Sequence, residues 1–225
     1  DPGNQQYQRS LAAYYAQTNQ LDKAEKTLRD AIQADPEDID RYLLLSELLA
    51  TRKSVAAAEK ELQAAIKLHP KSYKLHFALA KLYEAAEAYD KVAQTYRAII
   101  DVSGTEIDGL RARSMLAELL LKQKQWTEAE KLTEEVLKEN PNDNAGLINR
   151  ARLALLRKDP DSAITALRQV LRDQPASVDA NTLLASAHLQ KNETELAKES
   201  LLKSVELNPR DIKARLAYAQ FLAQN

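Results

Sequence analysis

Three histidines are the side chains best suited to combine metal binding with proton transfer near neutral pH. His69 directly precedes a proline, His76 lies on the large-residue side of a predicted helix, and His188 falls in a helical position that Tyr15 and Tyr83 occupy elsewhere. No two of them have the His-x-x-x-His spacing of a helical metal site. We interpret all three as packing or turn residues.

The other reactive side chains show no catalytic arrangement either. The sequence has no cysteine, which excludes disulfides, thiolate metal sites and thiol nucleophiles. It also has no glycine-rich phosphate loop and no nucleophile elbow. Its carboxylates are interleaved with Lys and Arg, a pattern typical of solvated helix faces. We therefore predict a protein that is not an enzyme and has no catalytic residues, no metal site and no cofactor.

Charge and composition narrow the class of partner. Lys+Arg 32 and Asp+Glu 33 leave a net charge of -1, and aromatic residues make up 5% of the 225 residues. Nucleic-acid binders usually carry a basic excess or aromatic stacking platforms, so no nucleic acid is expected. No uncharged apolar run approaches the roughly 18 residues that cross a bilayer, so no direct membrane insertion is expected. The abundance of strong helix formers predicts an all-α fold.

The prolines recur at a fixed interval. Pro2, Pro36 and Pro70 are 34 residues apart, as are Pro141, Pro175 and Pro209, and the interval from Pro70 to Pro141 is one period of 34 and one of 37. The missing marker in that interval falls at Gly104. Proline cannot continue a helix and disfavours helical geometry in the residue before it. The spacing predicts a repeated pair of helices, the second of which ends at each junction.

Columns of small and large residues share this period. Small residues let two helices approach closely, and large apolar residues next to them fill a core. The first small column is Ala12, Ser46, Ala80, Ala117, Ala151, Ala185 and Ala219, and the second is Ala24, Ala58, Val92, Ala129, Ala163 and Ala197. The large apolar columns have two exceptions, Arg150 and Thr133.

The first unit shows the pattern most clearly, with Leu11-Ala12-x-x-Tyr15 followed by Ala24, Leu28, Ala31 and Pro36. This pattern resembles the tetratricopeptide repeat over essentially the whole chain. The resemblance implies a single solenoid over residues 1–225, a right-handed α-α superhelix of about six helix-turn-helix repeats plus one extra helix. The expected repeats are 5–38, 39–72, 73–109, 110–143, 144–177 and 178–211, followed by a terminal helix 212–225.

The turns inside the repeats depart from the family pattern. The usual glycine is replaced by Asn19, Lys53, Glu87, Lys124, Lys158 and Asn192. Asn tolerates left-handed geometry, whereas Lys and Glu must be strained there or turn differently. Asp22-x-x-Glu25 and Thr127-x-x-Glu130 predict capping boxes, and Asp159-Pro160 predicts a cap followed by proline in the first turn.

The resemblance places a concave groove on the first helices of the repeats. Helical spacing of i, i+3, i+7 and i+10 on those helices selects four wall residues for each repeat. They are Gln6, Arg9, Ala13 and Ala16; Asp40, Leu43, Glu47 and Ala50; Lys74, Phe77, Lys81 and Glu84; Arg111, Ser114, Glu118 and Leu121; Ala145, Ile148, Arg152 and Leu155; and Asp179, Thr182, Ser186 and Leu189. Apolar side chains framed by cations suit an extended or helical segment with some acidic groups. The candidate partner-binding residues are Arg9, Leu43, Glu47, Lys74, Phe77, Lys81, Arg111, Ile148 and Arg152. Alternatively, Leu43, Phe77 and Ile148 pack between adjacent first helices and never contact a partner.

One function known in the family can be tested on the sequence. Chaperone-binding members hold acidic C-terminal tails with a two-carboxylate clamp of Lys, Asn, Asn, Lys and Arg. The matching positions here are Arg9, Ala13, Leu44, Lys74 and Ala78. We predict no clamp and no binding to such tails.

The sequence thus favours a protein-protein interaction scaffold that binds a peptide segment or partner domain. Alternatives are a docking arm of a larger enzyme or export machine, or an RNA-binding helical repeat, which the near-neutral charge disfavours. Residues 166–175 resemble bacterial repeat proteins of exopolysaccharide or envelope systems, which favours the bacterial envelope (periplasm) over the cytoplasm. Asp1-Pro2 lies one period before Asp35-Pro36, and the segment 212–225 is apolar around much of its surface. Both features predict a fragment of a longer array.

Overall fold

The computed structural model describes residues 5–224, so the predicted Asp1-Pro2 junction lies outside the described residues. These residues form thirteen helices and no strand, which confirms the all-α fold of six helix pairs and one additional helix. The helices are α1 (Gln5–Gln17), α2 (Leu21–Ala34), α3 (Ile39–Arg52), α4 (Val55–Leu68), α5 (Tyr73–Ala85), α6 (Tyr89–Ser103), α7 (Ile107–Lys122), α8 (Trp126–Glu139), α9 (Asn144–Leu156), α10 (Pro160–Asp173), α11 (Val178–Gln190), α12 (Thr194–Leu207) and α13 (Ile212–Gln224).

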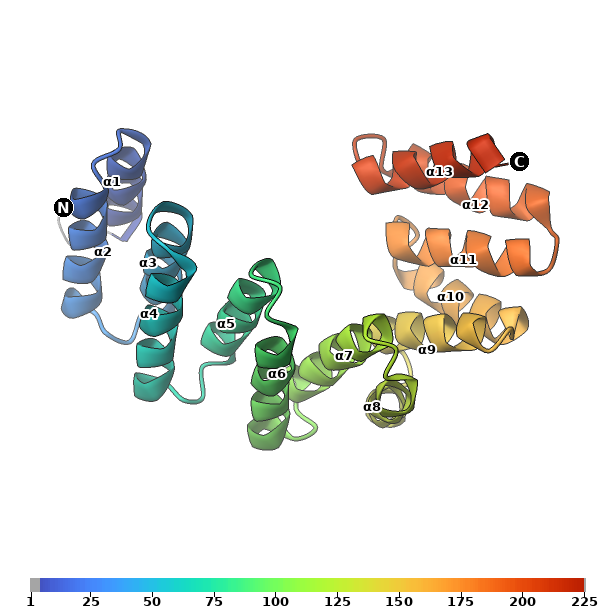
Figure 1. Cartoon of the computed structure of the whole chain (residues 1–225), viewed down its shortest axis with the longest axis horizontal. Coiled ribbons are helices and arrows are strands. Elements are labelled where there is room, and N and C mark those ends of the chain that lie inside the picture. Colours follow the sequence, from blue (N-terminus) through green and yellow to red (C-terminus); the bar gives the residue numbers. More distant parts are fainter. Residues whose placement is uncertain (1–4, 225) are drawn as a thin grey trace. The chain divides into compact units, whose positions relative to one another are not determined.

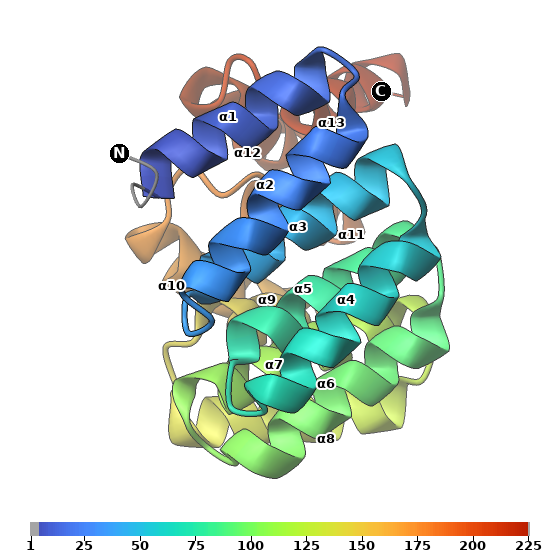
Figure 2. The same ribbon diagram turned by 90° about the vertical axis from the view of Figure 1, so that its left-hand side faces the viewer.

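The chain divides into two compact units, Asp1–Gly109 and Leu110–Asn225. In unit 1 each helix from α1 to α5 packs on the helix that follows it, and α3 also packs on α5. Figures 1 and 2 show α2, α4 and α6 of this unit following one another in one row, with α1, α3 and α5 in another. In unit 2 each helix from α8 to α12 packs on the helix that follows it. Helix α11 also packs on α9 and on α13. Each unit is therefore a stack of antiparallel helix pairs.

The helix ends fall where the prolines predict them. The residues that follow α2, α4, α8, α10 and α12 are Asp35, His69, Asn140, Gln174 and Asn208, and each immediately precedes a proline. The sixth end, that of α6, is Gly104, whose φ of 56° is in the left-handed region. The interpretation of Gly104 as the missing helix-ending residue is confirmed.

Five of the six turns within helix pairs contain a left-handed residue that is not glycine. Asn19, Glu87, Lys124, Lys158 and Asn192 have φ between 55° and 61°. In each turn the next residue donates its backbone N–H to a carbonyl five positions back, as Gln20 does to Tyr15 at 2.8 Å. This is the Schellman arrangement that ends many helices. The Glu and Lys residues therefore adopt the strained geometry that glycine would relieve.

The sixth turn, between α3 and α4, is different. Lys53 has a φ of -119° and is followed at once by Ser54, whose side chain accepts a hydrogen bond from the Ala57 N–H. The prediction that some Lys or Glu turns would differ from the rest is confirmed at this position.

The capping-box predictions are wrong, whereas the Asp159 cap is correct. The residues that precede α2 and α8 are Gln20 and Gln125, and neither makes a side-chain cap hydrogen bond. Both helices begin two residues earlier than a capping box at Asp22 or Thr127 requires, because the preceding left-handed turn already fixes where the chain enters the helix. Asp159 accepts a hydrogen bond from the Ser162 N–H at 3.1 Å, and Pro160 occupies the first turn of α10. The side-chain and backbone hydrogen bonds from Ser162 lower the pKa of Asp159.

The small-residue columns form the contact between paired helices. All six residues of the second column, from Ala24 to Ala197, have no exposed surface. The first column is buried from Ala12 to Ala185, and its seventh member, Ala219 on α13, is exposed. Thr133, an exception in a large apolar column, is fully buried and donates its hydroxyl to the Ala129 carbonyl of its own helix at 2.7 Å. The hydroxyl is thus satisfied without a partner on another helix.

Candidate protein-binding groove

The predicted groove residues of unit 1 lie on α1, α3 and α5. Because α3 and α5 are in direct contact, residues one period apart on these helices can pair. Lys74 on α5 forms an ion pair with Asp40 on α3 at 3.3 Å. Glu47, Lys81 and Arg9 are exposed.

The two apolar candidates of unit 1 are partly covered by the protein itself. Leu43 and Phe77 are half-buried. The Phe77 ring packs on the buried ring of Tyr96 with their centroids 6.3 Å apart. The Tyr96 hydroxyl in turn donates to the Glu84 carboxylate at 2.9 Å. Packing on Tyr96 therefore accounts for part of the burial of Phe77.

Unit 2 carries the remaining three candidates, on α7 and α9. Arg111 is exposed. Ile148 is half-buried against a core cluster that includes Leu147, Leu167 and Val170. Arg152 retains 24% of its side-chain surface and lies among carboxylates from two other helices.

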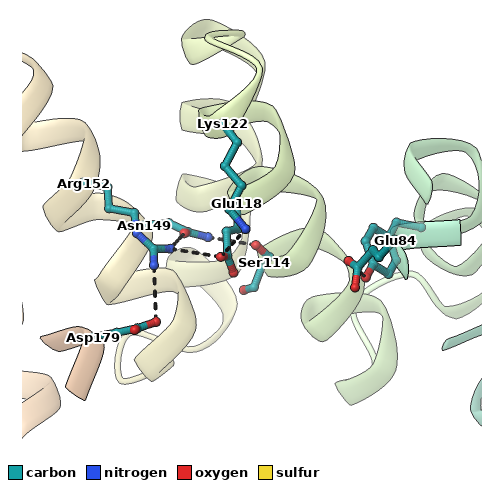
Figure 3. Close-up of polar contacts among 8 residues, drawn as sticks. Glu84, Ser114, Glu118, Lys122, Asn149, Arg152 and Asp179 are labelled. Carbon is teal, nitrogen blue, oxygen red and sulfur yellow. Dashed lines mark hydrogen bonds and ion pairs between the residues drawn. The ribbon is translucent and has the colours of Figure 1, made fainter. Parts of the chain in front are cut away.

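Arg152 is the centre of a polar row across three first helices (Figure 3). Its guanidinium is 3.8 Å from the Glu118 carboxylate on α7 and 3.5 Å from the Asp179 carboxylate on α11. Glu118 also pairs with Lys122 at 2.9 Å, one turn further along α7. Because these groups keep part of their surface, the row is screened by water and adds little stability. It does fix the direction of the Arg152 side chain.

A buried amide supports this row. Asn149 is 1% exposed and donates to the Ser114 carbonyl on α7 at 2.8 Å, while its oxygen accepts from Arg152 at 3.1 Å. The amide therefore links adjacent first helices and positions the guanidinium at the same time. Its burial makes the pair of hydrogen bonds costly to lose.

Beside the polar row, the surface of unit 2 is hollowed into an open depression of about 590 Å³. Leu121, Leu155, Leu156 and Leu183 contribute its apolar surface, and charged and polar side chains surround them. Gln190 reaches across from α11 and donates to the Leu155 carbonyl at 3.1 Å. Apolar surface ringed by polar groups is the arrangement in which short protein segments commonly bind.

Half of the residues that line this depression lie at positions predicted for the inner wall. Glu118, Leu121, Arg152, Leu155 and Ser186 lie at positions that helical spacing assigned to the inner wall, and all line it. Of the nine candidate residues, Arg152 is the one that lines this depression. The lining residues that helical spacing did not select are Lys122, Leu156, Lys158, Leu183 and Gln190. Most of them lie where the first helices end and the turns begin, and a periodic helical pattern does not extend into a turn.

The three histidines make local contacts. The His69 ring packs on Tyr42 with centroids 5.5 Å apart, and the His76 ring is 3.1 Å from the Pro70 carbonyl oxygen. His188 is buried, with its ring nitrogen 2.6 Å from the Glu193 carboxylate, and this hydrogen bond lowers the pKa of Glu193. Among residues 5–224, no three acidic or histidine side chains gather closely enough to hold a metal ion. In the same range no helix has the length and apolar character needed to span a bilayer.

Family models identify the class of protein. Residues 37–197 match the model described as "Tetratricopeptide repeat protein 21 ARM repeat", and residues 6–48 match the model "Tetratricopeptide repeat". The chain belongs to the tetratricopeptide repeat family. Repeats of this kind are generally non-catalytic scaffolds for protein-protein interaction. A search of curated protein sequences finds no match to this chain.

Solved structures share the fold at low sequence identity. A tetratricopeptide repeat protein from Parabacteroides merdae has a TM-score of 0.70 and 16% identity, with 97% of this chain and 86% of that chain covered. YrrB, described as having an unusual peptide-binding site, has a TM-score of 0.54 and 19% identity, covering 85% and 97%. PilW, a type IV pilus biogenesis factor, has a TM-score of 0.64 and 16% identity, covering 95% and 98%. These similarities establish the tetratricopeptide solenoid fold.

Proposed function

We propose that this chain is a non-catalytic scaffold that binds a short segment of a partner protein on its first helices, and that the depression of unit 2 is the principal site. The observation that carries the proposal is the apolar surface of Leu121, Leu155 and Leu156 beside a fixed guanidinium, Arg152. The proposal treats the six helix pairs and the terminal helix as one array of repeats.

The chemistry of the depression defines the ligand. Lys122, Arg152 and Lys158 line it together with one carboxylate, Glu118. Lys122 and Arg152 share the Glu118 carboxylate, whereas Lys158 forms no ion pair in the part of the chain that the structure describes. The ligand should therefore present one large apolar side chain and a nearby carboxylate. The similarity to YrrB, whose description names a peptide-binding site, supports this class of ligand.

We also propose that the chain works in the bacterial envelope, and that it binds neither chaperone C-terminal tails nor RNA. The likeness to PilW, described as a type IV pilus biogenesis factor, supports a place in the bacterial envelope and a role within a larger assembly. Arg9, Ala13, Leu44, Lys74 and Ala78 stand at the clamp positions, so we expect no binding of chaperone C-terminal tails. The near-neutral charge disfavours RNA.

The test starts from peptides selected on the purified chain from a displayed random library. Leu156→Glu with Lys158→Glu should lower the affinity for the tightest-binding peptide by about tenfold or more, because an apolar side chain and a cation are both replaced by carboxylates. Both side chains are exposed, so the variant should fold. The matched control is Leu207→Glu with Lys138→Glu, an exposed pair on other helices of the same unit.

The unit 1 wall is tested separately with Phe77→Ala and Lys81→Glu. Loss of affinity in this variant with no loss in the Leu156/Lys158 variant would move the site to α5. Unchanged affinity in both variants would refute binding on the first helices.

A further inference from the structure

The outer face of unit 2 contains a second depression, of about 670 Å³, between α10 and α12. Arg168 and Arg172 on α10 and Lys203 on α12 line it, with Leu171 and Leu184 contributing apolar surface. The three cations are exposed. Neither the first-helix depression nor the polar row of Arg152 includes any of them. This surface is therefore separate from the proposed groove.

Unit 1 has a matching depression that serves as an internal comparison. Helices α10 and α12 begin 139 residues after α2 and α4, and each has the same length as its counterpart. The depression of about 630 Å³ in unit 1 is lined by residues of α2 and α4 and by Lys53. The two depressions thus occupy equivalent places in two repeats.

The depression of unit 1 is neutralised by its own side chains. Arg29 pairs with Glu25 at 2.9 Å and with Glu61 at 3.1 Å, and Lys53 pairs with Glu25 at 2.5 Å. Lys26 pairs with Asp30 at 2.6 Å. Every cation on this surface has a carboxylate of the same surface within contact distance. Such a surface has no unpaired cation to offer to an acidic partner.

In unit 2 the equivalent carboxylates are missing. Arg168 stands where Arg29 stands, but the positions of Glu25 and Glu61 are occupied by Ile164 and Ser200. Gln169 replaces Asp30 in the same register.

Cations are added where unit 1 has neutral residues. Arg172 stands in place of Gln33, and Lys203 in place of Ala64. None of Arg168, Arg172 and Lys203 forms an ion pair with a carboxylate in the described residues 5–224. Three cations that share one depression repel one another, and this cost is removed when carboxylates from another molecule bind.

We propose that this outer depression docks an acidic segment of a partner protein. Arginine guanidinium groups bind carboxylates through two parallel hydrogen bonds, and Arg168 and Arg172 are one helical turn apart on α10. The apolar surface of Leu171 and Leu184 accommodates a leucine-sized side chain between two acidic residues. No aromatic side chain lines the depression, and the whole chain has a net charge of -1. An acidic peptide therefore fits better than a nucleic acid, which would need stacking platforms or a wider basic field.

The experiment measures fluorescence anisotropy of a labelled peptide, acetyl-Glu-Glu-Leu-Glu-Glu, against the purified chain at low ionic strength. The same peptide with glutamine in place of glutamate controls for charge. The test variant is Arg168→Glu with Arg172→Glu. The matched control is Lys198→Glu with Lys213→Glu, which makes the same change in net charge at two other exposed lysines of unit 2.

We expect the glutamate peptide to bind about tenfold or more tightly than the glutamine peptide, and its affinity to fall as salt rises. The affinity for the glutamate peptide should fall by about tenfold or more in the test variant, and by about twofold or less in the control variant. This peptide also has the leucine and carboxylates expected of a groove ligand, so the titrations are repeated with Leu156→Glu and Lys158→Glu added to parent and test variant. The same difference of about tenfold or more between the two should remain in that background, which separates the result from the fate of the groove proposal.

Any one of four results would overturn the proposal. Equal affinity for the two peptides, or equal affinity in the test variant and its parent, would show that the depression does not select carboxylates. Displacement of the peptide by inorganic phosphate at the same concentration would show a simple anion site. Tighter binding of an oligothymidylate than of the glutamate peptide would assign the surface to nucleic acid.

Discussion

Leu79→Ala tests whether the register of the repeat columns describes the forces that hold unit 1 together. Leu79 is on α5, next to the fully buried Ala80, and retains 7% of its surface. A buried Leu→Ala change costs about 2–5 kcal/mol, and the cost grows with the cavity left behind. Leu79 also lines an open depression formed by α4, α5 and α6, so water and neighbouring side chains can reach the space. We therefore expect a loss near the lower end, about 2–3 kcal/mol.

Hydrogen exchange with mass spectrometry is the appropriate assay, because repeat arrays unfold in parts and a single melting temperature averages over them. A loss of about 2–3 kcal/mol corresponds to exchange about 30- to 160-fold faster for amides of α5 and α6 that open only when unit 1 unfolds. The control is Leu68→Ala on α4, where the same side chain is 68% exposed. Its exchange should change by less than about threefold. If Leu79→Ala costs less than about 1 kcal/mol, or costs no more than Leu68→Ala, the assigned register is wrong.

Two further predictions concern charge and caps. The hydrogen bond with Lys53 is the main cause that lowers the pKa of Glu25, with Arg29 adding to it, so Glu25→Gln should lower the melting temperature at pH 7. Because the folded pKa is below the ordinary value of 4.5, this stabilisation is complete above that pH and is lost as the pH falls below it. The difference in melting temperature between parent and variant should therefore narrow as the pH falls below 4.5, and a difference that does not narrow would contradict the ion-pair explanation. Asp159→Ala should cost about 1 kcal/mol in urea unfolding, because it removes a cap hydrogen bond, whereas Thr127→Ala should change stability by less than about 0.5 kcal/mol. Equal losses in the two variants would mean that the cap at Asp159 does not stabilise α10.

Much of the fold could be predicted from the sequence because helix-ending residues and small core residues act locally. A proline terminates the preceding helix whatever surrounds it, so Asp35, Asn140 and Asn208 end helices as expected. Two helices can cross closely only where the residue at the crossing has a very small side chain. Ala24 and Ala163 occupy such positions and are fully buried. These effects need no knowledge of distant parts of the chain.

The starts of the second helices and the depressions were harder to predict because they depend on the turns. Asp22 and Thr127 have the residue types of a cap, but the left-handed residues Asn19 and Lys124 bring the chain into the helix two positions earlier. Whether a cation is paired depends on residues one repeat away, as the contrast between Arg29 and Arg168 shows. Comparing equivalent positions of two repeats would have revealed that contrast from the sequence.

The fully buried column from Ala24 to Ala197 has a consequence for how such a chain can change over evolutionary time. Any larger side chain there would push two helices apart, so these few positions must stay small, whereas most exposed positions can drift at little cost in stability. Sequences can therefore diverge widely while the helix pairs continue to stack, in keeping with the shared fold at 16% identity and a TM-score of 0.70. Partner choice resides in the positions that are free to drift, so family membership constrains the architecture of this chain far more tightly than it constrains what the chain binds.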